Sequence, residues 1–152
     1  MILLDANVLL YAYNASSEHH ERARSWLAGV LTEPREPVGF PWTTILAFLR
    51  ISTNPRAFPA PLSVGEAVSL VSDWLESPAT VLVAPGERHW AVLKPLLAAG
   101  QARGPLVTDA HLAALAIEHG AVLCTTDRDF ARFTGVRVAN PLEQQESSEA
   151  CG

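Results

Sequence analysis

The chain is poor in several residue types that would indicate particular classes of protein. It has only two cysteines and one lysine in 152 residues, so neither a disulfide framework nor a cysteine-rich metal site can be read from it. No apolar run approaches the roughly 18 residues of a transmembrane helix. The amino terminus also lacks the basic start of a signal peptide. We therefore expect a cytosolic protein that does not associate with membranes.

Apolar residues make up 49% of the chain and charged residues only 18%, which excludes a largely disordered protein and favours a buried sheet covered on both faces. A length of 152 residues fits one domain. The net charge of −5 disfavours nucleic-acid binding by bulk electrostatics. It does not exclude a nuclease, because bound cations can offset an acidic site and local arginines can follow phosphates.

Short apolar strands alternate with amphipathic helices along most of the chain. Strands are predicted over residues 2–4, 38–40, 80–84, 121–125 and 136–138. Helices are predicted from Asn7, after Ser17 as a cap, over 42–51, after Ser63, over 87–99, over 106–120 and from Asp127. This order predicts an α/β fold of three layers, with a central parallel sheet between helices. Residues 1–142 form one domain, and we expect the polar tail 143–152 to be mobile.

The helix predicted over residues 42–51 is apolar at nearly every position. Such a helix is buried on most sides, against the sheet and against something else. A second copy of the chain is the expected partner, so the sequence favours a homodimer.

Aspartates occur at three places where a strand ends or a helix begins: Asp5, Asp109, and the pair Asp127 and Asp129. Each could be a helix cap and nothing more. In a parallel sheet, however, the carboxyl ends of strands about 4.8 Å apart can bring such side chains into one cleft. Several like charges in a cleft repel unless a cation joins them. Oxygen ligands favour Mg²⁺ or Mn²⁺, which suits hydrolysis of a phosphodiester.

Three blocks of the sequence resemble motifs of VapC-type toxins, which are PIN-domain ribonucleases of toxin–antitoxin modules: Leu3–Leu9, Asp109–Ala114 and Thr125–Phe130. The resemblance implies a Mg²⁺-dependent endoribonuclease, a parallel sheet flanked by helices, a homodimer and inhibition by a cognate antitoxin. By their places in the motifs, Asp5 and Asp109 match the principal metal ligands of the family and Asp127 its fourth acidic residue. Asn7 matches a polar residue that supports the first aspartate.

The chain departs from the family in one place. The family usually has a glutamate near the position of Ala47 or Phe48, and no acidic residue occurs there. Whether one or two metal ions bind is therefore open. Asp129 either takes over part of the missing role or is a surface acid, and its spacing of two from Asp127 does not decide between them.

Arginines near the predicted cleft are the candidates for binding RNA phosphates, since a guanidinium matches a phosphate in shape and charge. They are Arg50, Arg56 and Arg128. Arg128 can equally be a surface charge, and Arg50 can pair with an acid of the protein. Trp42 and Phe58 could stack on a base, but such aromatic residues belong more often to a core or a dimer interface.

Two other functions compete with this reading. A phosphatase with Asp5 as nucleophile would need a second aspartate two residues later, where the chain has Asn7, and a lysine near the third motif, whereas Lys94 is the only one. A catalytically silent PIN-like module that binds RNA or a protein is the alternative that the missing glutamate favours. Stabilisation by Mg²⁺ or Mn²⁺ distinguishes them, because a metal that binds only the folded state raises its stability.

Overall fold

A five-stranded parallel sheet forms the centre of the protein in the computed structural model, which describes residues 1–143. The strand order is β3-β2-β1-β4-β5, and each pair of neighbours is parallel. The strands are β1 (Ile2–Leu4), β2 (Val38–Pro41), β3 (Thr80–Val83), β4 (Val122–Cys124) and β5 (Arg137–Ala139). The predicted fold class is confirmed. The mobility expected for the tail concerns residues 144–152, outside the described residues.

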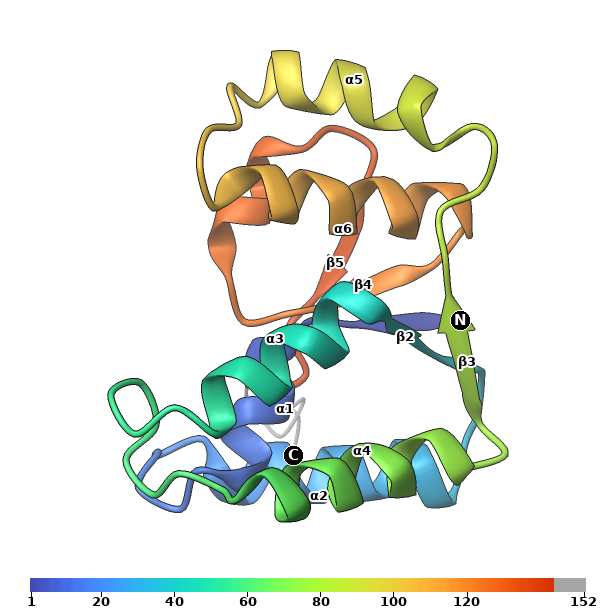
Figure 1. Ribbon diagram of the computed structural model, residues 1–152. Coiled ribbons are helices and arrows are strands. Elements are labelled where there is room, and N and C mark those ends of the chain that lie inside the picture. The colour runs from blue at the N-terminus through green and yellow to red at the C-terminus, as the bar shows by residue number, and fades with distance from the viewer. Residues whose placement is uncertain (144–152) are drawn as a thin grey trace, which may run out of the picture.

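Helices cover both faces of the sheet. Two parallel strands need a crossover connection, and a helix is the usual form of that connection. They are α1 (Ala6–Tyr13), α2 (His20–Thr32), α3 (Trp42–Ser52), α4 (Val64–Glu76), α5 (His89–Ala99), α6 (Leu106–Glu118) and the 3₁₀ helix η1 (Arg128–Arg132). In Figure 1, α5 and α6 lie above the sheet, and α1, α2 and α4 lie below it. None of the helices in residues 1–143 has the length and hydropathy needed to cross a bilayer.

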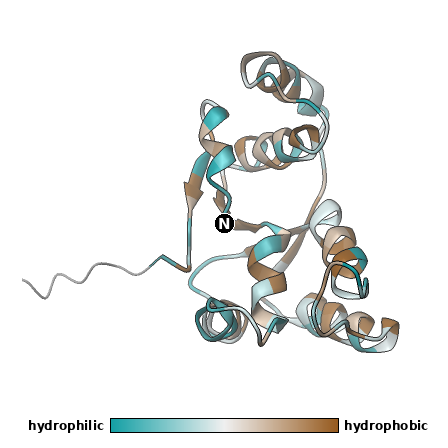
Figure 2. Cartoon of the chain, turned by 90° about the vertical axis from the view of Figure 1, so that its left-hand side faces the viewer, coloured by the Kyte–Doolittle hydropathy of each residue, from teal (hydrophilic) through white to brown (hydrophobic). Residues whose placement is uncertain are grey.

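The sheet separates two apolar cores, and neighbouring residues of β1 contribute to different ones. Leu4 belongs to the core that includes Phe48 and Trp74, whereas Leu3 belongs to the core that includes the buried face of α6. Both leucines are fully buried, and burying one such side chain contributes about 1.5–3 kcal/mol. In Figure 2 the helices around the sheet carry both polar and apolar residues. Strand β1 is thus fixed between two packed layers.

The predicted helix starts are right for α4 and wrong for α2. At α4, the Ser63 hydroxyl accepts a hydrogen bond from the Glu66 backbone N–H, and the Glu66 carboxylate accepts one from the Ser63 N–H. At α2, His19 is the capping residue and makes no side-chain cap. The Ser17 hydroxyl instead accepts from the His19 N–H at 3.1 Å, so it holds the turn before the helix.

Helix α3 differs from the prediction that it is buried on most sides. Ile45 and Phe48 are buried in the core, but Trp42 is 52% exposed and Leu46 is 58% exposed. These two residues lie four positions apart, so they share one face of the helix. Helix α3 therefore presents an apolar stripe on the surface of the chain.

Candidate active site

Asp5 lies at the carboxyl end of β1, and its two carboxylate oxygens have different partners. Oδ1 accepts a hydrogen bond of 2.7 Å from the Ala6 backbone N–H, which makes Asp5 the N-cap of α1. Oδ2 accepts a hydrogen bond of 2.8 Å from the Thr125 hydroxyl, just beyond β4. Capping the helix and contributing to a site are therefore compatible roles for Asp5.

Thr125 connects the polar residues at the ends of the two central strands. Its buried hydroxyl accepts hydrogen bonds from the Asn7 side-chain amide at 3.2 Å and from the Asp127 backbone N–H at 3.0 Å. The Asn7 carbonyl oxygen accepts a further bond of 3.4 Å from the Thr126 N–H. Because β1 and β4 are neighbours in the sheet, residues far apart in the sequence meet here.

The side chains of Asp127 and Asp129 lie in different surroundings. Asp127 caps η1 by accepting a hydrogen bond of 2.8 Å from the Asp129 backbone N–H. The Asp127 side chain lines the cleft described below, whereas Asp129 is exposed and does not line it.

Asp109 lies in the first turn of α6, and the neighbouring carboxylates affect its pKa. Its pKa is raised to about 6, first by burial and then by the negative charges of Asp5, Asp127 and Asp129. Arg132 acts in the opposite direction. The other three predicted aspartates are therefore close enough to raise the pKa of Asp109.

A cleft of about 460 Å³ lies between these carboxylates and helix α3. Asp5, Asp109 and Asp127 line it, together with Asn7. Another wall comes from α3, through Thr43, Thr44, Ala47, Arg50 and Ile51. The Thr44 hydroxyl donates a buried hydrogen bond of 2.7 Å to the Leu4 carbonyl oxygen, which fixes the start of α3 against the end of β1.

The other sequence candidates lie in different surroundings. Of the three arginines, only Arg50 lines the cleft, while Arg56 and Arg128 are exposed outside its lining. Phe58 is buried, which agrees with a core residue, and Trp42 is exposed on α3.

The donor set fits a divalent cation that keeps part of its water shell. Burial raises the pKa of Asp5, as does the nearby charge of Asp127, although hydrogen bonds from Thr125 and Ala6 oppose the shift. Such mutual repulsion is what a bound cation relieves. Within residues 1–143, no three acidic, histidine or cysteine side chains already converge on one point. The carboxylate and amide oxygens that line the cleft are ligands of the kind that Mg²⁺ and Mn²⁺ use.

Two polar residues near the cleft were missed in the sequence. Thr125 follows a buried strand and precedes Asp127 by two residues, so the polar run after the strand was the available signal. Arg132 is the last residue of η1, donates to the Gly100 carbonyl oxygen at 3.2 Å and lowers the pKa of Asp109. Its role depends on the packing of η1 against α6, which no local pattern reveals.

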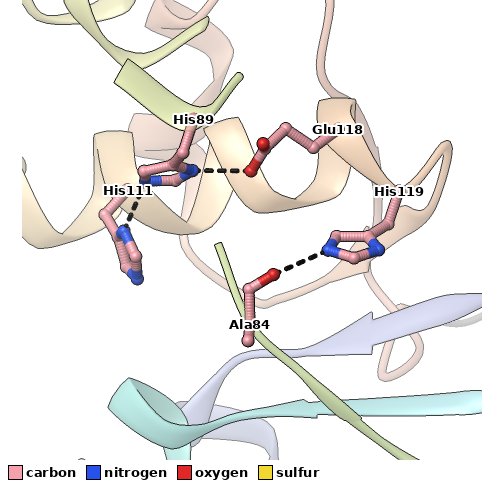
Figure 3. Close-up of polar contacts among 5 residues, drawn as sticks. All are labelled: Ala84, His89, His111, Glu118 and His119. Atoms are coloured by element: carbon pink, nitrogen blue, oxygen red, sulfur yellow. Dashed lines mark hydrogen bonds and ion pairs between the residues drawn. The ribbon is translucent and has the colours of Figure 1, made fainter. Parts of the chain in front are cut away.

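His89 and His111 form a polar network outside the lining of the cleft. His89 at the start of α5 contacts Glu118 at 2.6 Å through Nδ1 and His111 at 2.9 Å through Nε2 (Figure 3). Burial, followed by the charge of His89, lowers the pKa of His111. This network joins α5 to α6, the helix that carries Asp109.

Comparisons with known proteins identify the family of the chain. Residues 2–136 match the family described as PIN domain. "Ribonuclease VapC37" of Mycobacterium tuberculosis is 48% identical over 141 residues, covering 93% of this chain and 97% of that protein. "Ribonuclease VapC33" of the same bacterium is 35% identical over 144 residues, covering 95% of this chain and all of that protein.

Solved structures share the fold at low sequence identity. VapBC2 from Rickettsia felis, bound to a promoter DNA fragment, has a TM-score of 0.68 and 16% identity, and the match covers 92% of this chain and 98% of that one. VapC20 of Mycobacterium tuberculosis, described as a sarcin-ricin loop cleaving toxin, has a TM-score of 0.63 and 17% identity, over 90% and 99% of the two chains. With a family match along most of its length and relatives at 48% and 35% identity, this chain belongs to the PIN domain family, in its VapC group.

Proposed function

We propose that the protein is a Mg²⁺-dependent endoribonuclease, the toxin of a toxin–antitoxin pair, which hydrolyses phosphodiester bonds of RNA. The observation that carries this proposal is the cleft that Asp5, Asp109 and Asp127 line, in which the pKa of Asp109 is raised to about 6. The relatives of this chain that are named VapC ribonucleases support RNA as the substrate. Because the substrate is RNA, we place the activity in the cytoplasm.

The aspartates of the cleft have distinct roles in this proposal. Asp5 and Asp109 hold the cation, and Asp127 contributes through a water ligand or directly. Asn7 supports this arrangement through Thr125. Asp129 is exposed, so it acts through its negative charge and not as a principal ligand. When bound, Mg²⁺, or Mn²⁺ in its place, activates a water molecule and neutralises charge on the phosphate.

Individual arginines in and around the cleft bind phosphates of the RNA, although the chain as a whole is acidic. Arg50 lies in the cleft, and Arg56 and Arg128 are exposed cations that contact more distant phosphates of the same strand. Each would contribute to the salt dependence of binding, since a neutralised phosphate releases counterions.

A cognate antitoxin is the proposed protein partner, as VapBC complexes among the solved relatives suggest. A groove of about 660 Å³ between α2 and α4 offers an apolar floor made by Leu27, Leu31, Leu70 and Trp74. An amphipathic segment of the antitoxin would bury its apolar side there. Unchanged antitoxin binding by Leu70→Glu would contradict this location.

A silent module that binds RNA without cutting it is the second candidate, because α3 brings no acidic residue to the cleft. The aspartyl-nucleophile phosphatase is less well supported, since Asn7 occupies the position where its second aspartate is needed.

The decisive experiment incubates the purified chain with total RNA and Mg²⁺ and maps new RNA ends. We expect cleavage by the wild-type protein and none by Asp5→Asn, which removes a ligand charge but keeps the shape of the side chain. Asp73→Asn, at an exposed position on α4, is the matched control and should cleave normally. Full activity of Asp5→Asn at saturating Mg²⁺ would refute the metal site, and binding without cleavage by the wild type would favour the silent module.

A further inference from the structure

The wall that α3 contributes to the cleft carries a positive charge and no negative one. Thr43, Ala47 and Arg50 follow each other at spacings of four and three, so they lie on one face of the helix. Arg50 is the only charged residue of α3. The remaining charged residues of the cleft lining are Asp5, Asp109 and Asp127.

The Arg50 guanidinium is not engaged by the rest of the described chain. Within residues 1–143, Arg50 makes no ion pair and no side-chain hydrogen bond. Arg50 therefore lines the same cleft as the aspartates without a partner among the described residues, and its five N–H donors remain available to a ligand.

The charge balance of the cleft indicates which ligand that is. Three ionised aspartates outweigh one divalent cation by one negative charge, and this excess would repel an RNA phosphate. A guanidinium on the α3 wall cancels it. Arginine also matches a phosphate group geometrically, because two parallel N–H groups can bind two phosphate oxygens.

We propose that Arg50 is a catalytic residue that binds the scissile phosphate of RNA from the α3 wall, so that the cleft works with a single divalent cation and one guanidinium. This inference rests on the proposed ribonuclease function. In it, Arg50 orients the phosphate between α3 and the aspartates and stabilises the negative charge that grows on the phosphate oxygens during hydrolysis.

The test compares Arg50→Ala, Arg50→Lys and the control Arg35→Ala, which changes an exposed arginine outside the cleft lining. Binding of a labelled single-stranded RNA is measured by fluorescence anisotropy in EDTA, where no metal-dependent cleavage occurs. For Arg50→Ala we expect weaker binding and a salt slope shallower by about 1. Arg50→Lys should keep the slope but not the affinity, and Arg35→Ala should match the wild type.

Two further measurements separate this role from a structural one. In Mg²⁺, the single-turnover cleavage rate of Arg50→Ala should fall by about 100-fold, the effect of losing one preorganised donor. Its Mg²⁺-induced rise in melting temperature should equal that of the wild type, because Arg50 is no metal ligand. Wild-type binding and cleavage by Arg50→Ala, or loss of its response to Mg²⁺, would overturn the inference. If the wild-type chain binds RNA through Arg50 but never cleaves it, the ribonuclease function and the catalytic role of Arg50 are both refuted. Arg50 would then be a residue that contacts an RNA phosphate and nothing more.

Discussion

Thr125 and Asp5 are joined by a hydrogen bond of 2.8 Å, although 120 positions separate them in the chain. A hydroxyl can donate one hydrogen bond and accept two. Thr125 uses this full capacity, since it donates to Asp5 and accepts from the Asn7 amide and the Asp127 N–H. The orientation of the Asp5 carboxylate and the start of the Asp127 turn are thus fixed by one buried atom.

The first prediction concerns this hydroxyl. Thr125→Val keeps the shape of the side chain but leaves the partners of the hydroxyl unpaired, at a cost of about 1–3 kcal/mol for each buried polar group that water cannot reach. Because the change also releases the Asp5 carboxylate, which we propose as a metal ligand, we expect Mg²⁺ affinity to fall by about 10- to 100-fold. Melting curves over a Mg²⁺ titration measure both effects.

Thr125→Ser is the control, because it restores the hydroxyl and loses only a methyl group. It should recover most of the Mg²⁺ affinity. If Thr125→Val binds Mg²⁺ as tightly as the wild type, the hydrogen bond to Asp5 does not position the carboxylate for the metal.

The second prediction follows from the raised pKa of Asp109. In the folded, metal-free protein this carboxyl holds its proton up to about pH 6, whereas in the unfolded chain it loses the proton near 3.8. Between these values the folded state binds more protons, so the contribution of Asp109 to stability falls as the pH rises and is constant above about pH 6.

Melting temperatures in EDTA should therefore fall less with rising pH, between 4 and 6, in Asp109→Asn than in the wild type. If Mg²⁺ binds the ionised Asp109 carboxylate, as we propose, its stabilisation of the wild type should grow as the pH rises through 6. If the melting temperatures of the wild type and Asp109→Asn change equally with pH in EDTA, the pKa of Asp109 is not raised by its surroundings.

The sequence was sufficient for features that depend on short patterns. The alternation of strands and helices predicted the sheet, and the positions of Asp5 and Asp109 at element boundaries predicted that both line one cleft. Features that depend on packing between distant segments were not readable. Ser17 has the character of a cap, but the turn that it stabilises delays the helix to His20. Similarly, apolar character alone did not reveal that Trp42 points outward while Phe48 points inward.

The third prediction is a homodimer that uses the exposed face of α3. Trp42 and Leu46 leave a large apolar area uncovered on one chain, and such areas in soluble proteins commonly mark interfaces. Sedimentation at micromolar concentration should show a species of twice the 16.4 kDa chain mass. Leu46→Glu should give the single-chain mass without loss of helix content, because the position is exposed. A wild-type protein found only as one chain would contradict the prediction.

The last prediction concerns an acidic residue placed on α3. The sequence left open whether Ala47 or Phe48 is the equivalent position, and the structure distinguishes them: Ala47 lines the cleft, whereas Phe48 is fully buried with its ring 4.6 Å from that of Trp74. Phe48→Glu should therefore lower the free energy of unfolding by several kcal/mol, since it removes a large core side chain and buries an unpaired charge. It should gain nothing from Mg²⁺.

Ala47→Glu should behave in the opposite way, and Ala47→Gln is its uncharged control. The added carboxylate reaches the cleft, so the variant should melt slightly earlier than Ala47→Gln in EDTA, because it adds to the repulsion among the aspartates. Its rise in melting temperature with Mg²⁺ should exceed that of the wild type, since a further ligand strengthens metal binding and binding stabilises the folded state. Arg50 lies three residues away on the same face and competes for the new charge. If Ala47→Glu responds to Mg²⁺ no more than Ala47→Gln does, the carboxylate pairs with Arg50, and the α3 wall contributes nothing to the metal.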